Sequence, residues 1–218
     1  MDCSEYQYRG SQHWNPAFAN FLAKVVADIP GVESICELGC GNGAMARLLV
    51  EEGYDVVGVD ASGSGIQIAK TASKGAVFYH DRIDHGLASR LGRASSFDLV
   101  LSSEVIEHLY RPADLLEAAL SLIRPGGWLV LTTPYHGYLK YLALALSDRM
   151  DRHLNPNWEG GHIKFFSPSS LRALVSQYGF SDVSFTFFGR FLAFWKSMAL
   201  VARVPGPCQV VTTSGTSL

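Results

Sequence analysis

The sequence predicts an α/β fold, a doubly wound and mostly parallel sheet of seven strands, and three observations support this. Apolar, strand-like runs alternate with amphipathic helical patterns through short connections. Several of these runs end in a carboxylate, which would gather acids at the carboxyl edge of a parallel sheet. The first run leads through three glycines directly into a helix. One antiparallel strand is expected near the C-terminal end of the chain.

Size and composition suit one large domain. The chain has 218 residues, of which 48% are hydrophobic and 17% charged, so it can bury a sizeable core and is not a disordered chain. We assign residues 15–204 to one domain with an insertion at 134–161, residues 1–14 to an N-terminal segment or lid, and residues 205–218 to a disordered tail. The net charge of −2 offers nothing to attract nucleic acid, so we expect a small-molecule or lipid-like partner instead.

The cysteines and the chain's start indicate a cytoplasmic protein. Four cysteines without any CxxC pair or zinc-ligand spacing are typical of reduced thiols. The first residues lack the apolar core of a signal peptide. No uninterrupted apolar run reaches the roughly 20 residues of a transmembrane helix. Peripheral contact with a membrane stays open.

The first helix is expected where Asn15 and Pro16 combine a capping side chain with a proline at the first turn. Its end is predicted at Pro30 and Gly31. The residues between them place one apolar face at helical spacing, formed by Phe18, Phe21, Leu22, Val25, Val26 and Ile29. This face is interpreted as core packing.

The central feature is the segment 35–43, a short apolar strand that leads through glycines into a helix starting at Ala44. Glycines allow positive φ angles and a close approach to a ligand, and the helix directs its free N–H groups at the turn. The spacing, Glu37-x-Gly39-x-Gly41-x-Gly43, differs from the G-x-G-x-x-G pattern of dinucleotide-binding proteins. A protein that binds a nicotinamide cofactor or a nucleotide sugar is therefore an alternative that this glycine spacing does not favour.

Further strands are expected at residues 54–60, 76–81, 97–101 and 128–132, with helices at 62–73 and after Arg111-Pro112. Asp60 and Asp81 close two of these strands, and Glu104 follows a third. Carboxyl ends of parallel strands share one edge of the sheet. We therefore expect these acids to converge on one crevice together with Glu37.

Two further segments, taken together with the glycine motif, resemble a known family. Ser102-Ser103-Glu104-Val105-Ile106-Glu107-His108-Leu109 follows the fourth strand, and Leu122-Ile123-Arg124-Pro125-Gly126-Gly127 precedes the fifth. With the glycine motif, they resemble class I S-adenosylmethionine-dependent methyltransferases, and among these the ubiquinone-pathway O-methyltransferases. The resemblance covers about residues 33–133, with a looser echo at 161–167 and 179–180.

The resemblance implies a Rossmann-like fold, S-adenosylmethionine as cofactor and methyl transfer. Oxygen of a small-molecule or lipid-like acceptor is the preferred target, with carbon, nitrogen or a non-catalytic partner subunit as alternatives. By resemblance, Asp60 binds the ribose and Asp81 the adenine amino group. The full set of implied cofactor contacts is Glu37, Gly39, Cys40, Gly41, Asp60, Ala61, Asp81, Arg82, Ser103 and Glu104. The charge of the expected crevice also favours S-adenosylmethionine, because several acids suit its cationic sulfonium and amino group better than a pyrophosphate.

Two interpretations compete for the segment after the fourth strand, where Glu104, Glu107 and His108 would share one face of a helix. With His162, they offer oxygen and imidazole ligands for a divalent cation, which some relatives use. Alternatively, His108 positions or deprotonates the acceptor, and activity falls in acid near the usual imidazole pKa of about 6.5. We prefer the second, take His108 and His162 as catalytic, expect them to meet, and assign no metal ligand.

The insertion breaks the alternation of strands and helices. Residues 138–146 form an apolar stretch that predicts a helix over the acceptor pocket. We interpret it as ordinary packing against the sheet and keep contact with a membrane surface as the alternative. Residues 147–161 are polar, Ser167-Pro168 caps another helix, and residues 182–188 and 194–202 are expected to be the closing strands.

Overall fold

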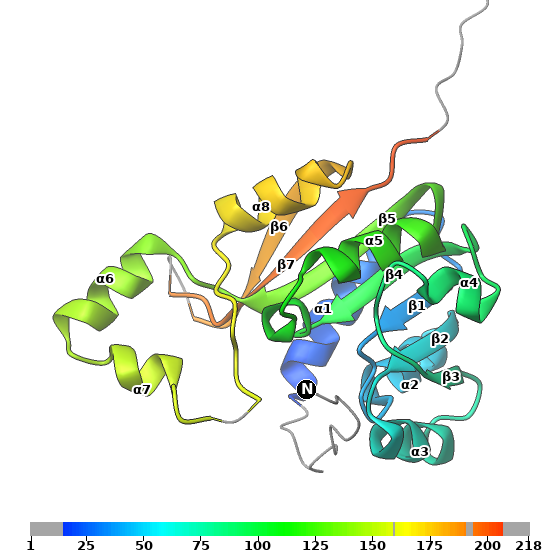
Figure 1. The fold of residues 1–218 in the computed structure, drawn as a ribbon, viewed down its shortest axis with the longest axis horizontal. Coiled ribbons are helices and arrows are strands. Elements are labelled where there is room, and N and C mark those ends of the chain that lie inside the picture. Colours follow the sequence, from blue (N-terminus) through cyan, green and yellow to red (C-terminus); the bar gives the residue numbers. More distant parts are fainter. Residues whose placement is uncertain (1–14, 159, 191–193, 207–218) are drawn as a thin grey trace, which may run out of the picture.

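The computed structural model describes residues 15–158, 160–190 and 194–206. Its seven strands form one sheet in the order β3-β2-β1-β4-β5-β7-β6 (Figure 1). The strands are β1 (Ser34–Leu38), β2 (Asp55–Asp60), β3 (Val77–His80), β4 (Phe97–Ser103), β5 (Ile123–Pro134), β6 (Ser181–Phe188) and β7 (Ser197–Arg203). β7 runs antiparallel to both of its neighbours, and the other adjacent pairs are parallel. The predicted mostly parallel sheet with one antiparallel strand is confirmed.

Helices cover both faces of the sheet (Figure 1). One face carries α1 (Pro16–Ala27), α2 (Ala44–Glu51) and α3 (Gly63–Ala72), and the other carries α4 (Leu87–Leu91), α5 (Ala113–Leu122) and α8 (Pro168–Gln177). Successive strand residues point to opposite faces. Ile35 accordingly joins the core under α1 and α2, whereas Cys36 joins the core under α5. The continuous apolar runs of the sequence follow from burial on both faces.

The capping signals in the sequence start the helices where they were expected. The Asn15 side chain accepts hydrogen bonds from the Ala17 and Phe18 N–H groups at 3.1 and 3.3 Å, and Pro16 opens α1. The Ser167 hydroxyl accepts from the Ser170 N–H at 3.2 Å, in a capping box ahead of α8. These contacts satisfy N–H groups that have no partner inside a helix.

Two helices were not expected, α4 and α7 (Met150–Leu154). Each is only five residues long, too short to show an apolar period. β5 begins at Ile123 rather than residue 128, because Ile123 already pairs with Phe97 of β4. The last strand begins at Ser197, later than the expected residue 194.

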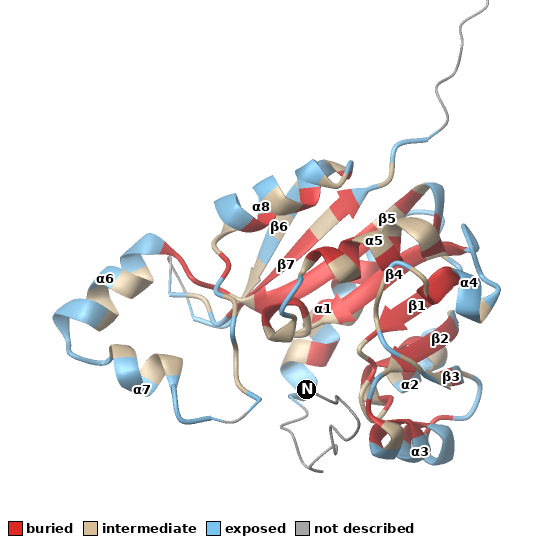
Figure 2. Cartoon of the chain, in the orientation of Figure 1, coloured by how far each residue is buried: buried red, intermediate tan, exposed pale blue. Residues whose placement is uncertain are grey.

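The insertion folds into α6 (Tyr138–Leu146) and α7, which contact each other and project from the edge of the three-layered body (Figure 1). No residue of α6 is buried (Figure 2). The preferred interpretation of this stretch, ordinary packing against the sheet, is therefore wrong. Four of its large apolar side chains are exposed instead, including Tyr138 at 77% and Leu146 at 81% accessible. In the part of the chain that the structure describes, no helix combines the length and apolarity needed to cross a membrane.

Some predictions fall on residues that the structure does not describe. The N-terminal segment or lid, residues 1–14, and positions 207–218 of the predicted tail lie outside the described residues. Cys36 and Cys40 are free and buried thiols, as expected for reduced cysteines. The cytoplasmic location stays a prediction.

Candidate active site

The glycine turn lies between β1 and α2 and takes the conformation that its glycines predict. Gly39, Gly41 and Gly43 have φ angles of +82°, +53° and +73°. A Cβ atom on Gly39 would lie 2.3 Å from Cγ2 of Val105, so no larger residue fits without displacing the segment after β4. The turn and that segment therefore touch directly.

Asp60, at the end of β2, joins this turn to the next one. Its Oδ2 accepts a hydrogen bond from the Gly41 N–H at 2.8 Å, and its Oδ1 accepts from the Ser62 N–H at 2.7 Å. The carboxylate thus lies beside the glycine turn, at the strand end where the sequence predicted a ribose site. The carbonyl of the adjacent Ala61 lies 3.0 Å from Nε2 of His80.

Glu37 is a buried acid behind the turn, only 2% exposed, and its Oε2 has no hydrogen-bond partner among the described residues. Burial, and then the charge of Asp60, raise the pKa of Glu37 to about 8. A cation nearby would favour the ionised carboxylate and reverse this shift. Burial also raises the pKa of the Cys40 thiol, with further increases from the charges of Glu37 and Asp60, so this thiol is protonated and unreactive.

Asp81 and Arg82 follow β3 at the same sheet edge, and the Asp81 N–H donates to the Asp60 carbonyl at 3.1 Å. The Asp81 side chain, however, accepts from Nε of Arg90 at 2.9 and 3.1 Å. Arg82 pairs with Asp84 at 2.6 Å. The structure thus engages Asp81 with a cation from α4, a helix that the sequence did not predict.

Glu104 and Ser103 lie at the end of β4. Glu104 has a positive φ of 54°, and its Oε1 accepts from the Ser197 hydroxyl of β7 at 2.6 Å. The Ser103 hydroxyl accepts from the Thr132 hydroxyl at 3.2 Å. Burial raises the pKa of Glu104, and the charge of Glu104 in turn raises that of Glu107. Of the four acids expected to converge, Glu37 and Asp81 each lie next to Asp60, whereas Glu104 lies next to Glu107.

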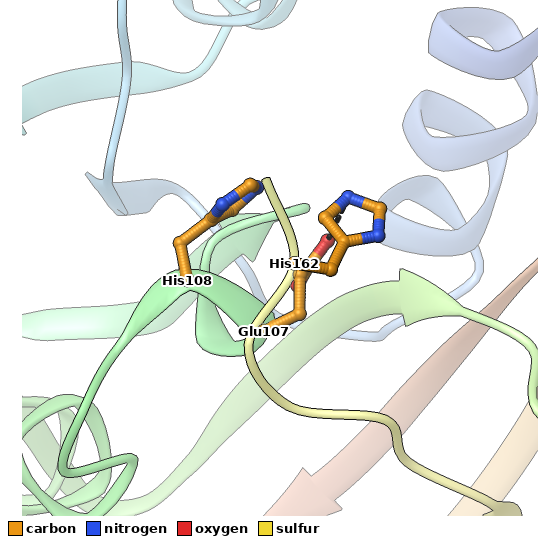
Figure 3. Close-up of side chains that lie close together, drawn as sticks. All are labelled: Glu107, His108 and His162. Carbon is orange, nitrogen blue, oxygen red and sulfur yellow. Dashed lines mark ion pairs between the residues drawn. The ribbon is translucent and has the colours of Figure 1, made fainter. Parts of the chain in front are cut away.

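The expected pair of histidines does come together. His108 ends the short helix η1 (Ile106–His108), and the rings of His108 and His162 lie 4.9 Å apart (Figure 3). Glu107 is fully buried, and neither of its carboxylate oxygens has a hydrogen-bond partner among the described residues. Nε2 of His162 lies 3.9 Å from Oε1 of Glu107. One ligand atom from each of Glu107, His108 and His162 lies within 4.8 Å of the others.

Main-chain contacts hold this cluster together. The Glu107 carbonyl accepts from the N–H groups of Ile163 and Lys164 at 2.9 and 3.0 Å, which fixes the segment carrying His162 over η1 (Figure 3). Nδ1 of His108 lies 3.2 Å from the Gly161 carbonyl. The Trp158 ring lies 5.5 Å from the His162 ring and was not predicted as a site residue. The sequence could have indicated Trp158 only through its position shortly before Gly160 and Gly161, where the chain was expected to turn.

Burial sets the protonation states in the cluster. It lowers the pKa of His108 and, with the charge of His108, lowers that of His162 to about 4. Burial, and then Glu104, raise the pKa of Glu107. The expected loss of activity in acid near pH 6.5 must therefore move to lower pH. Two neutral imidazoles can accept a proton, and together with Glu107, whose ionised form a nearby cation would favour, they fit a divalent cation.

A hollow of about 420 Å³ adjoins this cluster, and His162 belongs to its lining. α6, α7 and the residues before β7 form its other walls. We call it the α6–α7 hollow. It lies where the sequence predicted that the insertion would shape a pocket.

Comparisons with known proteins agree with this geometry. Residues 11–184 match the sequence model of a family described as "Methyltransferase domain". A protein named ubiquinone biosynthesis O-methyltransferase, from Hydrogenovibrio crunogenus, is 29% identical over 151 residues, which are 67% of this chain and 61% of that protein. The protein of the same name from Leptothrix cholodnii is 25% identical over 77% of this chain and 72% of its own length.

Solved structures share the fold. A SAM-dependent methyltransferase from Archaeoglobus fulgidus has a TM-score of 0.63 at 18% identity, over 85% of this chain and 92% of that one. Magnesium protoporphyrin IX methyltransferase from Synechocystis, with bound SAH, has a TM-score of 0.61 at 20% identity, over 86% and 81% of the two chains.

Proposed function

The chain belongs to the class I S-adenosylmethionine-dependent methyltransferases, and on that premise we propose that it methylates a hydroxyl oxygen of a small-molecule or lipid-like acceptor. The observation that carries the choice of oxygen is the cluster of Glu107, His108 and His162, which contains neutral imidazoles able to accept a proton. The contact between Val105 and Gly39 places this cluster next to the glycine turn.

We propose the glycine turn and the neighbouring strand ends as the cofactor site. Asp60 offers two carboxylate oxygens for ribose hydroxyls, which would replace the N–H groups that it now accepts from. The buried carboxyl of Glu37, whose ionised form a nearby cation would favour, matches the cationic methionine end of the cofactor. Asp81 can accept the adenine amino group on a second lone pair while it keeps Arg90.

The proposed reaction is a direct displacement. The acceptor oxygen forms a bond to the methyl carbon while the carbon–sulfur bond breaks, and the sulfonium becomes a neutral thioether. The hydroxyl proton passes to the imidazole of His108. Alignment of oxygen, carbon and sulfur supplies most of the acceleration. A general base typically contributes about 10²–10⁴-fold.

A divalent cation at the cluster is a second candidate, favoured by the two unpartnered oxygens of the fully buried Glu107. Glu107, His108 and His162 would hold the ion. When bound, it would polarise the acceptor oxygen and lower its pKa. The sequence-based assignment of no metal ligand stays a prediction.

The lipid-like character of the acceptor is supported by α6. Its exposed apolar side chains include Tyr138, Leu139, Leu142 and Leu146. Exposed apolar side chains gathered on one helix are a feature of surfaces that contact apolar ligands or lipids. The name of the relatives, ubiquinone biosynthesis O-methyltransferase, is consistent with an apolar acceptor. Methylation of carbon or nitrogen, or a non-catalytic partner subunit, remains the alternative.

Calorimetric titration with S-adenosylmethionine and with NAD tests the cofactor, and we expect binding of the first only. Turnover with labelled cofactor on phenolic, lipid-like and glycan acceptors tests the reaction. If His108 acts as a base, activity survives a chelator and falls only below pH 6.5, because burial lowers the pKa of His108. If a cation is required, the chelator abolishes activity, and Mg²⁺, Mn²⁺ or Zn²⁺ restores it. Cofactor binding without methylation of any acceptor would favour the partner subunit.

A further inference from the structure

The lining of the α6–α7 hollow is strongly basic. It includes four cationic side chains, Lys140 of α6, Arg149 just before α7, and Arg190 and Lys196 on either side of residues 191–193. None of the described residues that line the hollow is acidic. The four cations also form no ion pair within the described part of the chain. In a chain with a net charge of −2, this concentration of positive charge is local.

The cations act on one another. Lys140 is half-buried, and its Nζ donates to the carbonyls of Tyr135 at 2.8 Å and Trp195 at 3.3 Å. Burial, and then the charge of Arg190, lower the pKa of Lys140 to about 8. Like charges gathered around a partly enclosed space repel each other, and an anion between them removes that cost.

Two histidines add unpartnered polar atoms to the same lining. His136 is only 6% exposed, and Nε2 of both His136 and His153 is enclosed without a hydrogen-bond partner among the described residues. Nδ1 of His136 lies 2.7 Å from the Tyr141 hydroxyl. When that hydroxyl donates to Nδ1, the proton of the neutral ring is on Nε2, which then needs an acceptor. Buried polar atoms without partners are rare, and a bound ion or water is one of the reasons for them.

We propose that the α6–α7 hollow binds an oxyanion, a carboxylate or phosphate group carried by the methyl acceptor. The cations of the lining supply charge, and the enclosed imidazoles supply hydrogen-bond donors. This proposal rests on the proposed function, because it names the acceptor's charged group. The hollow shares His162 with the proposed reaction centre, so the anchored group and the reacting hydroxyl belong to neighbouring parts of one molecule.

The oxyanion could belong to a soluble acceptor or to a lipid headgroup. The lining of the hollow also includes two exposed aromatic side chains, Phe165 and Phe194. They would contact an acyl or prenyl chain next to the anchored group. The two sources share one chemistry and differ in whether the anion binds when it is free in solution.

The test is direct binding, with inorganic pyrophosphate as the soluble probe and vesicles as the lipid probe. The vesicles contain phosphatidylcholine alone or four parts of it with one part phosphatidylglycerol. The informative variant is Arg149→Gln/Lys196→Gln, since both side chains are exposed and removal of their charge leaves the core intact. The matched control is Arg152→Gln/Lys74→Gln, which removes the same charge from exposed residues outside the lining. S-adenosylmethionine binding is measured on every sample.

We expect the wild-type protein to bind pyrophosphate or the anionic vesicles, and added salt to weaken the binding. The informative variant should bind about tenfold more weakly or worse, and the control like wild type. Pyrophosphate binding indicates a soluble anion, and binding to anionic vesicles alone indicates a headgroup. Failure to bind either probe, or equal weakening in the control, overturns the proposal. If the protein binds the anion but not S-adenosylmethionine, the proposed function fails while this inference stands.

Discussion

The glycine turn and the α6–α7 hollow differ in the ionisable groups that they gather, acids at the turn and bases around the hollow. Around the turn, the acids Glu37 and Asp60 are buried or half-buried, and Asp60 accepts two main-chain hydrogen bonds. Around the hollow, cations and imidazoles dominate, and two of the imidazoles keep an unpartnered nitrogen. Neighbouring sites of opposite sign suit a cationic methyl donor and an anionic acceptor. Attraction between the two ligands would then help to bring them into contact.

The largest expected effect comes from the cluster between the two regions. His108→Ala should lower turnover by about 10²–10⁴-fold and leave cofactor binding unchanged, because a general base acts on the acceptor alone. His85→Ala, at an exposed histidine outside the cluster, is the control. Steady-state turnover and calorimetric titration measure the two quantities. Equal activity of both variants would remove His108 from the reaction.

Asp60→Ala should weaken cofactor binding at the glycine turn. Loss of a charge-assisted hydrogen bond costs about 1.5–3 kcal/mol, so the cofactor should bind roughly ten- to a hundredfold more weakly. Asp55→Ala, at the opposite end of the same strand, should bind like wild type. Titration of folded protein, checked by circular dichroism, decides between them. An unchanged dissociation constant for Asp60→Ala contradicts the ribose assignment.

A smaller effect is expected on the pH dependence of cofactor binding, and it tests the charge of Glu37 at the glycine turn. Glu37 has a pKa of about 8 without ligand, so it is largely protonated at pH 7. A cationic cofactor favours the ionised form, and binding should therefore release a proton below pH 8. Affinity should rise with pH toward 8, by at most about tenfold per unit. Titrations in buffers with different ionisation heats count the proton, and Glu37→Gln should release none. Identical proton release in this variant assigns the proton to another group.

The smallest expected effect is at the exposed apolar residues of α6. Leu139→Ser/Leu146→Ser removes exposed apolar surface from α6, so stability should change by only about 0.5 kcal/mol per site. If a lipid-like acceptor contacts α6, its KM should rise by roughly two- to tenfold while kcat is kept. Ile68→Ser, at an exposed apolar residue of α3, is the control. A KM that stays at the wild-type value would place the acceptor's apolar part elsewhere.

The contrast between the regions also explains what the sequence could predict. The glycine turn is built from contiguous residues, and its positive φ angles are a property of glycine itself. Strand ends follow from the alternation of elements, so the positions of Asp60 and Asp81 at one edge could be predicted. The partner of Asp81 could not, because Arg90 lies on a helix of five residues without an apolar period.

The α6–α7 hollow depends on tertiary structure. Lys140 and Lys196 are 56 positions apart in the sequence, and nothing local indicates that they line one space. The exposure of α6 could not be predicted for a related reason. An apolar helix has the same sequence pattern whether it packs against a sheet or stays exposed. The meeting of His108 and His162 could be predicted, because both were expected to lie at one sheet edge.

The carbonyl of Glu107 has a consequence for how this enzyme can diverge. By accepting from Ile163 and Lys164, it anchors the returning end of the insertion to the segment after β4 through the main chain alone. Because these bonds require no particular side chain at either donor, drift in the insertion between Tyr138 and Trp158 can proceed without moving His162. Lineages can therefore acquire new acceptors by replacing α6 and α7 while they inherit the same chemistry.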